Sequence, residues 1–262
     1  MKICSKSLLT IGVVAFLGLQ CTNADAQKKQ VPSGPSIDNY FVPSSAESMT
    51  PDEQGFIRRW LLLEPISKPN RTNAVFTDSY LREVFAKEYF PNQLSVVPKH
   101  GDKVKVTVEV QPPVNLQHGR PVAPTEPQKP IYKKETLQWH AFDSKLFNTK
   151  LFRFATGLNK QRYGVIFWAV TVVNCDEDME NVRLAVGSNS ASMWWIDGKE
   201  VLLLSGDRRM VVDDCVSSLI SLKKGKNVLR GAIINGPGMS DFCVRFLDAN
   251  GQPIKSITIT NK

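Results

Sequence analysis

The chain has 262 residues and a formal net charge of +8, and 42% of its residues are hydrophobic. This length allows one large domain with a substantial core. The lysines and arginines are scattered, without a basic stripe interleaved with stacking aromatics, which argues against nucleic-acid binding. The charge therefore indicates a solvated basic surface.

The first 26 residues have the pattern of a secretory signal peptide. Two lysines supply positive charge, residues 8–19 are almost wholly apolar, and Ala24-Asp25-Ala26 offers a small-residue cleavage site. The apolar run is shorter than the roughly 20 residues that a membrane-spanning helix needs, and no later segment comes closer. We therefore expect an exported protein, periplasmic or extracellular, without a transmembrane segment.

Cys21 offers an alternative, as a lipidated first residue that would anchor the protein to a membrane. The preceding Leu19-Gln20 disfavours it, because a bulky amide stands where lipoprotein processing requires a small side chain. Residues 27–50 are rich in Ser, Pro, Gln and Lys and lack apolar periodicity, which predicts a flexible leader. The folded part is then a single domain over residues 51–262.

The beginning of this domain contains two predicted helices and a strand. Thr50, followed by proline and two acidic residues, is typical of a short helix start. The apolar run 56–63 is short and bounded by glycine and proline, which favours a buried strand. Residues 78–90 carry apolar side chains at helical spacing and predict an amphipathic helix.

Strands are predicted for most of the remaining chain. In residues 103–110, KVKVTVEV, valines alternate with polar side chains, as in a half-buried strand. Six prolines between 111 and 130 predict a long exposed loop, after which 134–139 resumes an extended chain. Residues 163–173 are apolar on both faces and favour a central strand.

Short strands and turns alternate after this central strand. Further strands are predicted at 182–186, 228–234 and 242–246. Turn signals occur at Asp197-Gly198, Lys224-Gly225, 235–238 and Asn250-Gly251. Because no helices alternate with these strands, the pattern predicts an all-β fold, an antiparallel β-sandwich or jelly roll.

Residues 186–206, VGSNSASMWWIDGKEVLLLSG, contain the clearest turn signal. Asp197-Gly198 predicts a tight hairpin, because both central positions of the preferred turn need positive φ. Alternation along the strand sends Trp194 and Trp195 to opposite faces. We expect one indole in the core and the other near the surface, where it would be available to a sugar.

The serines of this segment lack the features of a catalytic nucleophile. A nucleophile elbow reads Gly-x-Ser-x-Gly, whereas residues 187–191 lack the second glycine and lead into another strand. The chain has three histidines, His100, His118 and His140. His140 has a carboxylate close in sequence, Asp143, but this spacing does not establish a general base. We therefore assign no catalytic residue.

Acidic residues and cysteines do not define a cofactor site. The acids at 176–178 and 213–214 fit solvated turns better than a glycosidase pair, whose carboxylates must face each other across a sugar. No cofactor is expected. Calcium is the one alternative, because these acids could help to bind it, but they lack EF-hand spacing. Cys175, Cys215 and Cys243 lack metal-ligand spacing, which leaves buried thiols or one disulfide with one free thiol.

Carbohydrate recognition is the function that the remaining polar and aromatic residues favour. Exposed aromatics stack on the apolar faces of sugars, while amides, carboxylates and guanidinium groups bond the hydroxyls. The candidate ligand-binding residues are Trp194, Trp195, Asn189, Asp207, Arg208 and Arg209. The alternative is that both tryptophans belong to the core and that the polar residues cap turns.

Five stretches together resemble the galactose-binding-like jelly-roll domain of exported bacterial polysaccharide-degradation proteins. They are FIRRWLLLEP at 56–65, YGV at 163–165, Gly187-Ser188 followed by MWWIDGK at 193–199, LKKGKN at 222–227 and FCVRF at 242–246. The whole chain is also similar to exported proteins labelled acetylxylan esterase-like. The resemblance implies a jelly roll over about 56–260 and a role in polysaccharide utilisation, although the nucleophile motif of an esterase is missing.

The sequence thus predicts an exported antiparallel β-sandwich with a short helical N-terminal decoration. Its predicted function is non-catalytic carbohydrate recognition or an accessory role, with a polysaccharide or oligosaccharide as partner. One alternative is a carbohydrate esterase, whose acetate release would depend on the hairpin serines and His140. The other is a scaffold or subunit that binds another exported protein.

Overall fold

The structure is a computed structural model that describes residues 36–262, except 71, 111–115, 118–119 and 122–128. The described residues form antiparallel sheets packed as a β-sandwich, which confirms the predicted fold class. The predicted signal peptide, Cys21 and the part of the predicted leader up to residue 35 lie outside the described residues. Among the residues described, no helix is long and apolar enough to cross a membrane.

A ten-stranded sheet forms the first layer. Its strands are β1 (Phe41–Pro43), β2 (Arg59–Leu63), β3 (Ile66–Ser67), β4 (Lys103–Val110), β7 (Ile131–Ser144), β8 (Val165–Cys175), β10 (Ala191–Ile196), β11 (Lys199–Leu204), β14 (Gly225–Asn235) and β16 (Thr258–Thr260). Their order is β1-β7-β2-β8-β14-β10-β11, with β3 and β16 also paired to β8 and β4 paired to β7. The predicted central strand is β8, which has neighbours on both sides.

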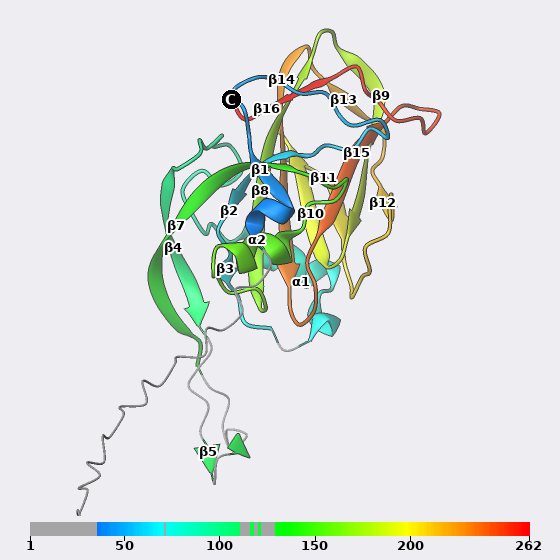
Figure 1. The fold of residues 1–262 in the computed structure, drawn as a ribbon. Helices are drawn as coiled ribbons and strands as arrows, with labels where there is room; N and C mark the ends of the chain where they lie inside the picture. The colour runs from blue at the N-terminus through cyan, green and yellow to red at the C-terminus, as the bar shows by residue number, and fades with distance from the viewer. Residues whose placement is uncertain (1–35, 71, 111–115, 118–119, 122–128) are drawn as a thin grey trace, which may run out of the picture. The chain divides into compact units, whose positions relative to one another are not determined.

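A four-stranded sheet forms the second layer. Its strands are β9 (Met179–Ser188), β12 (Cys215–Val216), β13 (Ile220–Leu222) and β15 (Phe242–Leu247). The helices are η1 (Ile37–Asn39), η2 (Asn73–Val75), α1 (Asp78–Ala86) and α2 (Leu151–Gly157). Figure 1 shows β9, β12 and β15 on one side of the view and the curved β4–β7 pair on the other.

Both faces of the ten-stranded sheet are buried, and each has its own hydrophobic core. The core between the two sheets contains Phe167 of β8 together with Leu184 of β9 and Phe242 of β15. On the opposite face, Trp168 packs under Phe85 of α1 and the valines of β4. Successive side chains of β8 point alternately into these two cores. This explains why the sequence of β8 is continuously apolar.

The tryptophans of the β10–β11 hairpin point to opposite faces, as alternation predicts, but both are buried. Trp194 is 0% exposed and packs edge-on against Trp60 and Phe242, with ring centroids 6.0 and 5.2 Å away. Trp195 is 4% exposed and stacks on Trp168 at 5.7 Å. The expectation of one exposed indole is therefore wrong, because the second face of the sheet is covered as well.

The predicted hairpin turn is confirmed. Asp197 and Gly198 both have positive φ, at 49° and 79°, as the tight turn requires. The Asp197 carboxylate also accepts a hydrogen bond from the Val228 amide at 2.8 Å, on β14. The turn therefore joins β10 to β11 and holds them against the neighbouring strand.

Three predictions for the N-terminal half need correction. The helix predicted at 78–90 is shorter, because α1 ends at Ala86. The helix predicted to start at Thr50 does not form: the Asp52 carboxylate accepts hydrogen bonds from the amides of Gln54 and Phe56, which closes a turn instead. The folded part also begins before residue 51, since β1 pairs with β7.

The proline-rich segment 111–130 connects β4 to β7. It contains a short antiparallel pair, β5 (Leu116–Gln117) and β6 (Arg120–Pro121), and the other parts of the segment up to residue 128 lie outside the described residues. β4 and β7 pair along their full facing lengths, and Val106 and Val108 are buried as alternation predicts. The segment is thus the connection of a long hairpin.

Cys175, Cys215 and Cys243 are free thiols in the structure. Cys175 and Cys243 are buried, and Cys215 is half-buried. Burial raises the pKa of Cys243 to about 12, which keeps this thiol protonated at neutral pH. This arrangement corresponds to the predicted alternative of buried thiols rather than to a disulfide.

Candidate functional site

Four of the six predicted ligand-binding residues line one cavity. Asn189 follows β9, and Asp207, Arg208 and Arg209 follow β11. The cavity has a volume of ≈ 220 Å³ and adjoins a second hollow of ≈ 310 Å³ that shares the three residues after β11. Connecting loops of a β-sandwich are a common place for binding sites, because the strands hold them rigidly.

The other wall of this cavity comes from segments that the sequence did not indicate. They are Asn73 of η2 and residues 237–239, which follow β14. Asn73 Nδ2 donates a hydrogen bond to Asp207 Oδ1 at 2.7 Å, and Asn73 Oδ1 accepts one from the Gly236 amide at 3.2 Å. Asn73 therefore links the two loops across the cavity. We call the residues that line this cavity the loop site: Asn73, Asn189, residues 207–209 and residues 237–239.

The two arginines of the loop site differ in their partners. Arg208 Nε donates to Asp214 Oδ2 at 2.8 Å, and Arg208 Nη1 donates to the Ser205 carbonyl at 2.9 Å. Arg209 is exposed, and within the described part of the chain its guanidinium has no hydrogen-bond or ion-pair partner. Arg208 is thus held in place by the protein, while Arg209 remains available to a ligand.

The loop that carries these arginines is anchored on the second sheet. Arg245 of β15 donates from Nε to Asp213 Oδ1 at 3.0 Å. Gly187 of β9 lies directly beneath the loop, where a Cβ atom would overlap the carbonyl oxygen of Val211 and lie 2.9 Å from Cε of Met210. The glycine therefore permits the close approach of loop and strand.

The remaining predicted site residues, Trp194 and Trp195, do not reach the loop site. Their burial in the two cores leaves neither indole placed to stack on a sugar. The loop site instead has Met239, whose side chain is 44% exposed, as its apolar group. Met239 was missed because a single methionine after a glycine turn carries no recognisable signal in the sequence.

The hairpin serines are closed to solvent. Ser188, Ser190 and Ser192 are each at most 1% exposed. Ser192 Oγ accepts a hydrogen bond from Trp194 Nε1 at 3.0 Å, which assigns that hydroxyl a structural role. A nucleophile must be accessible to its substrate and lie within hydrogen-bond reach of a base, and these three positions give a substrate no access.

His140 contacts a different carboxylate from the one that its sequence position indicates. Its Nε2 lies 3.5 Å from Oε1 of Glu64, and Lys160 Nζ lies 3.1 Å from Oε2 of the same carboxylate. Asp143, the acid close to His140 in sequence, is bound by Arg59, with Nε 2.8 Å from Oδ1. Glu64 therefore belongs to a charge network that joins the end of β2, β7 and the segment after α2.

A pH dependence of stability follows from the burial of His140. Burial lowers the pKa of His140 below its ordinary value of 6.5, although Glu64 acts in the opposite direction and His100 and Lys160 add to the lowering. The unfolded chain then binds a proton more readily, so the stability from neutral His140 is complete above pH 6.5 and is lost as the pH falls through the lower, folded pKa.

His140→Gln is expected to flatten this dependence. Urea unfolding measured at several pH values below 6.5 should show a smaller fall in the free energy of unfolding for the variant than for the unmodified protein. An identical slope for both proteins would show that the burial of His140 does not control its protonation.

Among the described residues, no group of three or more His, Cys, Asp or Glu side chains is arranged to hold a metal ion. The acids 176–178 and 213–214 are instead used separately. Asp178 accepts a hydrogen bond from the Lys224 amide at 2.7 Å, and Asp213 binds Arg245. The calcium alternative therefore has no cluster of ligands to support it in the described part of the chain.

No family model and no curated protein matches the chain. Two solved structures show partial similarity to it. The PA14 sugar-binding domain from an RTX adhesin has 8% identity and a TM-score of 0.39, covering 76% of this chain and 94% of that domain. The PA14 domain of the MpAFP antifreeze protein has 8% identity and a TM-score of 0.36, covering 84% of this chain and 96% of that domain.

Proposed function

We propose that the protein is a non-catalytic carbohydrate-binding protein and that the loop site binds the sugar. The observation that carries this proposal is the convergence of amide, carboxylate and guanidinium groups from separate segments on one cavity. Sugar hydroxyls both donate and accept hydrogen bonds, and these three groups supply both functions in planar, directional form. The export and polysaccharide-utilisation role expected from the sequence is part of this proposal.

The dimensions of the loop site favour a small part of a glycan. Its volume of ≈ 220 Å³ lies below the ~300–1,000 Å³ of typical drug-sized ligand pockets. The exposed Met239 supplies an apolar contact for a sugar face, and Arg209 and Asp207 supply charged hydrogen-bonding groups. We therefore propose recognition of one or two sugar units, with modest affinity.

Arg209→Gln tests the loop site most cleanly, because it breaks no ion pair within the described chain. In affinity gels with acetylated xylan and other polysaccharides, we expect Arg209→Gln to be retarded less than the unmodified protein. The affinity should fall roughly tenfold, as for loss of a hydrogen bond to a charged group. Lys255→Gln, an exposed cation outside the site, is the matched control. Equal retardation of Arg209→Gln and the unmodified protein would contradict the assignment of the site.

The same preparation distinguishes the two alternative functions. An acetate-release assay with acetylated xylan tests the carbohydrate esterase, and the activity should then be lost in Ser188→Ala, Ser190→Ala, Ser192→Ala or His140→Gln. Light scattering and a search for a stable complex test the scaffold that binds another exported protein. Retardation without acetate release and without assembly supports the carbohydrate-binding proposal.

A further inference from the structure

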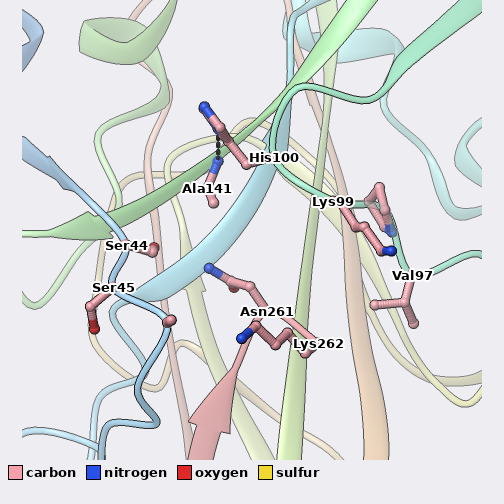
Figure 2. Close-up of a pocket in the computed structure, with 10 residues that line it drawn as sticks. Ser44, Ser45, Val97, Lys99, His100, Ala141, Asn261 and Lys262 are labelled. Carbon is pink, nitrogen blue, oxygen red and sulfur yellow. Dashed lines mark hydrogen bonds between the residues drawn. The ribbon is translucent and has the colours of Figure 1, made fainter.

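A cavity of ≈ 700 Å³ shares no lining residue with the loop site. Its walls come from residues 44–46, 97–100 and 261–262 and from Ala141, whose amide donates a hydrogen bond to His100 Nδ1 at 3.1 Å (Figure 2). Among the described residues, no phenylalanine, tyrosine or tryptophan lines this cavity. It therefore offers a sugar none of these rings to stack on, unlike the surface beside the loop site.

Aromatic rings and arginines alternate on a surface formed by α2 and the segments that follow η1 and α2. Arg153 Cζ lies 5.3 Å from the ring centroid of Tyr40 and 5.8 Å from that of Phe152. Arg162 Cζ lies 5.4 Å from the same Phe152 ring and 5.6 Å from the ring of Tyr163. These distances are within the ~6 Å range of cation–π contacts. The five residues therefore form one continuous row, which we call the arginine–aromatic row.

The arginine–aromatic row borders the loop site. The Phe152 amide donates a hydrogen bond to the Ser240 carbonyl at 2.9 Å. The buried Asn235 donates from Nδ2 to the carbonyls of Arg162, at 3.2 Å, and Gly238, at 3.1 Å. Gly238 also lines the loop site. One chain segment therefore separates the two surfaces, so a glycan bound in the loop site can continue onto the row.

Part of the row is open to solvent. Tyr163 is 46% exposed and Arg162 is exposed, while the other three members are half-buried. Within the described part of the chain, neither Arg153 nor Arg162 forms an ion pair. An aromatic ring contacts the face of a guanidinium group, whereas the N–H donors point outward from its edge. Both cations therefore keep hydrogen-bond donors for a ligand.

Two acidic residues near the row do not neutralise its arginines. Asp241 is 5% exposed, and its Oδ2 lies 2.7 Å from Nζ of Lys150. Asp38, two positions before Tyr40, accepts a hydrogen bond from Ser36 Oγ at 3.2 Å and forms no ion pair with a described residue. No carboxylate among the described residues is thus paired with the row, and unpaired cations favour an anionic ligand.

We propose that the protein binds an acidic polysaccharide and that the arginine–aromatic row holds a uronic acid unit of this glycan. The inference rests on the proposed function, because the loop site takes the neighbouring sugar unit. The uronic acid carboxylate pairs with Arg162, Arg153 adds a second positive charge, and the apolar face of the sugar packs on Tyr163. A planar guanidinium group binds a carboxylate through two parallel hydrogen bonds, which suits this role.

The test compares affinity gels that contain glucuronoxylan with gels that contain the same polysaccharide after reduction of its carboxyl groups to alcohols, at one ionic strength. The unmodified protein is expected to bind the acidic form more tightly. Arg162→Gln and Arg153→Gln should each weaken binding of the acidic form roughly 2- to 5-fold, as for loss of an exposed ion pair, and leave binding of the reduced form unchanged. Tyr163→Ala should weaken binding of both forms, because stacking does not require the carboxylate.

Lys255→Gln is the matched control, since it removes one positive charge from an exposed residue outside both surfaces. Equal affinity of the unmodified protein for the two forms, or equal losses in Arg162→Gln and Lys255→Gln, would overturn the inference. So would a dependence on Arg162 that appears with dextran sulfate and not with glucuronoxylan.

Arg209→Gln separates a failure of this inference from a failure of the proposed function. It should weaken binding of the acidic and reduced forms alike, because the loop site contacts the part of the glycan that both forms share. If Arg209→Gln weakens binding and Arg162→Gln does not, the loop site stands and the row is no subsite. If neither form retards the unmodified protein, both proposals are wrong.

Discussion

Trp194→Ala is expected to lower the free energy of unfolding by about 3–5 kcal/mol, the cost of truncating a large buried aromatic. The indole is fully buried between the sheets and packs against Trp60 and Phe242. Its Nε1 also donates a hydrogen bond to Ser192 Oγ, which would lose its partner. Urea unfolding followed by circular dichroism measures the change without relying on tryptophan fluorescence.

Tyr163→Ala provides the comparison, because Tyr163 is 46% exposed and its truncation opens no cavity in the core. A small effect of Trp194→Ala, similar to that of Tyr163→Ala, would show that Trp194 is not part of the core. Gly231 gives an independent check, since a Cβ there would lie 2.7 Å from Cε3 of Trp194. Gly231→Ala should therefore destabilise the unmodified protein more than the Trp194→Ala variant.

Local signals were sufficient to predict much of the sheet. The Asp197-Gly198 turn, the alternating valines of β4 and the apolar run of β8 each follow from backbone geometry or burial within a few residues. Helix α2 was missed, because its seven residues are too few to display helical periodicity and no side chain caps its start.

The burial of both tryptophans could not be predicted from alternation alone. Alternation assigns opposite faces, but whether a face is covered depends on distant segments, here α1 and β4. The burial of Arg230 could not be predicted from the sequence either. Its position on β14 gives no sign of burial, yet its side chain is 1% exposed. Burial lowers its pKa to about 10.

The loop site was predicted in part for a related reason. Asn189 and the residues 207–209 lie near the hairpin and were recognised by their side-chain chemistry. Asn73 was not, because it lies 134 positions from Asp207 and only the folded chain brings the two together. Contacts of such long range leave no local pattern, so the second wall of a site between loops requires the structure.

Gly187→Ala is expected to damage the loop site more than the fold. The new Cβ would overlap the carbonyl oxygen of Val211, a backbone atom that can move only with its loop. Overpacking of this kind costs roughly 1–3 kcal/mol. The displaced loop carries Asp207 and Arg209, so retardation by polysaccharides in affinity gels should fall by at least as much as in Arg209→Gln.

Gly251→Ala is the matched control, because it introduces the same methyl group at a residue that does not line the loop site. Gly251 has a φ of 78° and open space around its Cβ position, so the substitution strains the backbone without displacing a neighbour. Both variants should lose stability in urea unfolding, but only Gly187→Ala should lose polysaccharide binding. If Gly187→Ala binds as the unmodified protein does, the position of the 207–214 loop does not determine binding, and the sugar contacts must lie elsewhere.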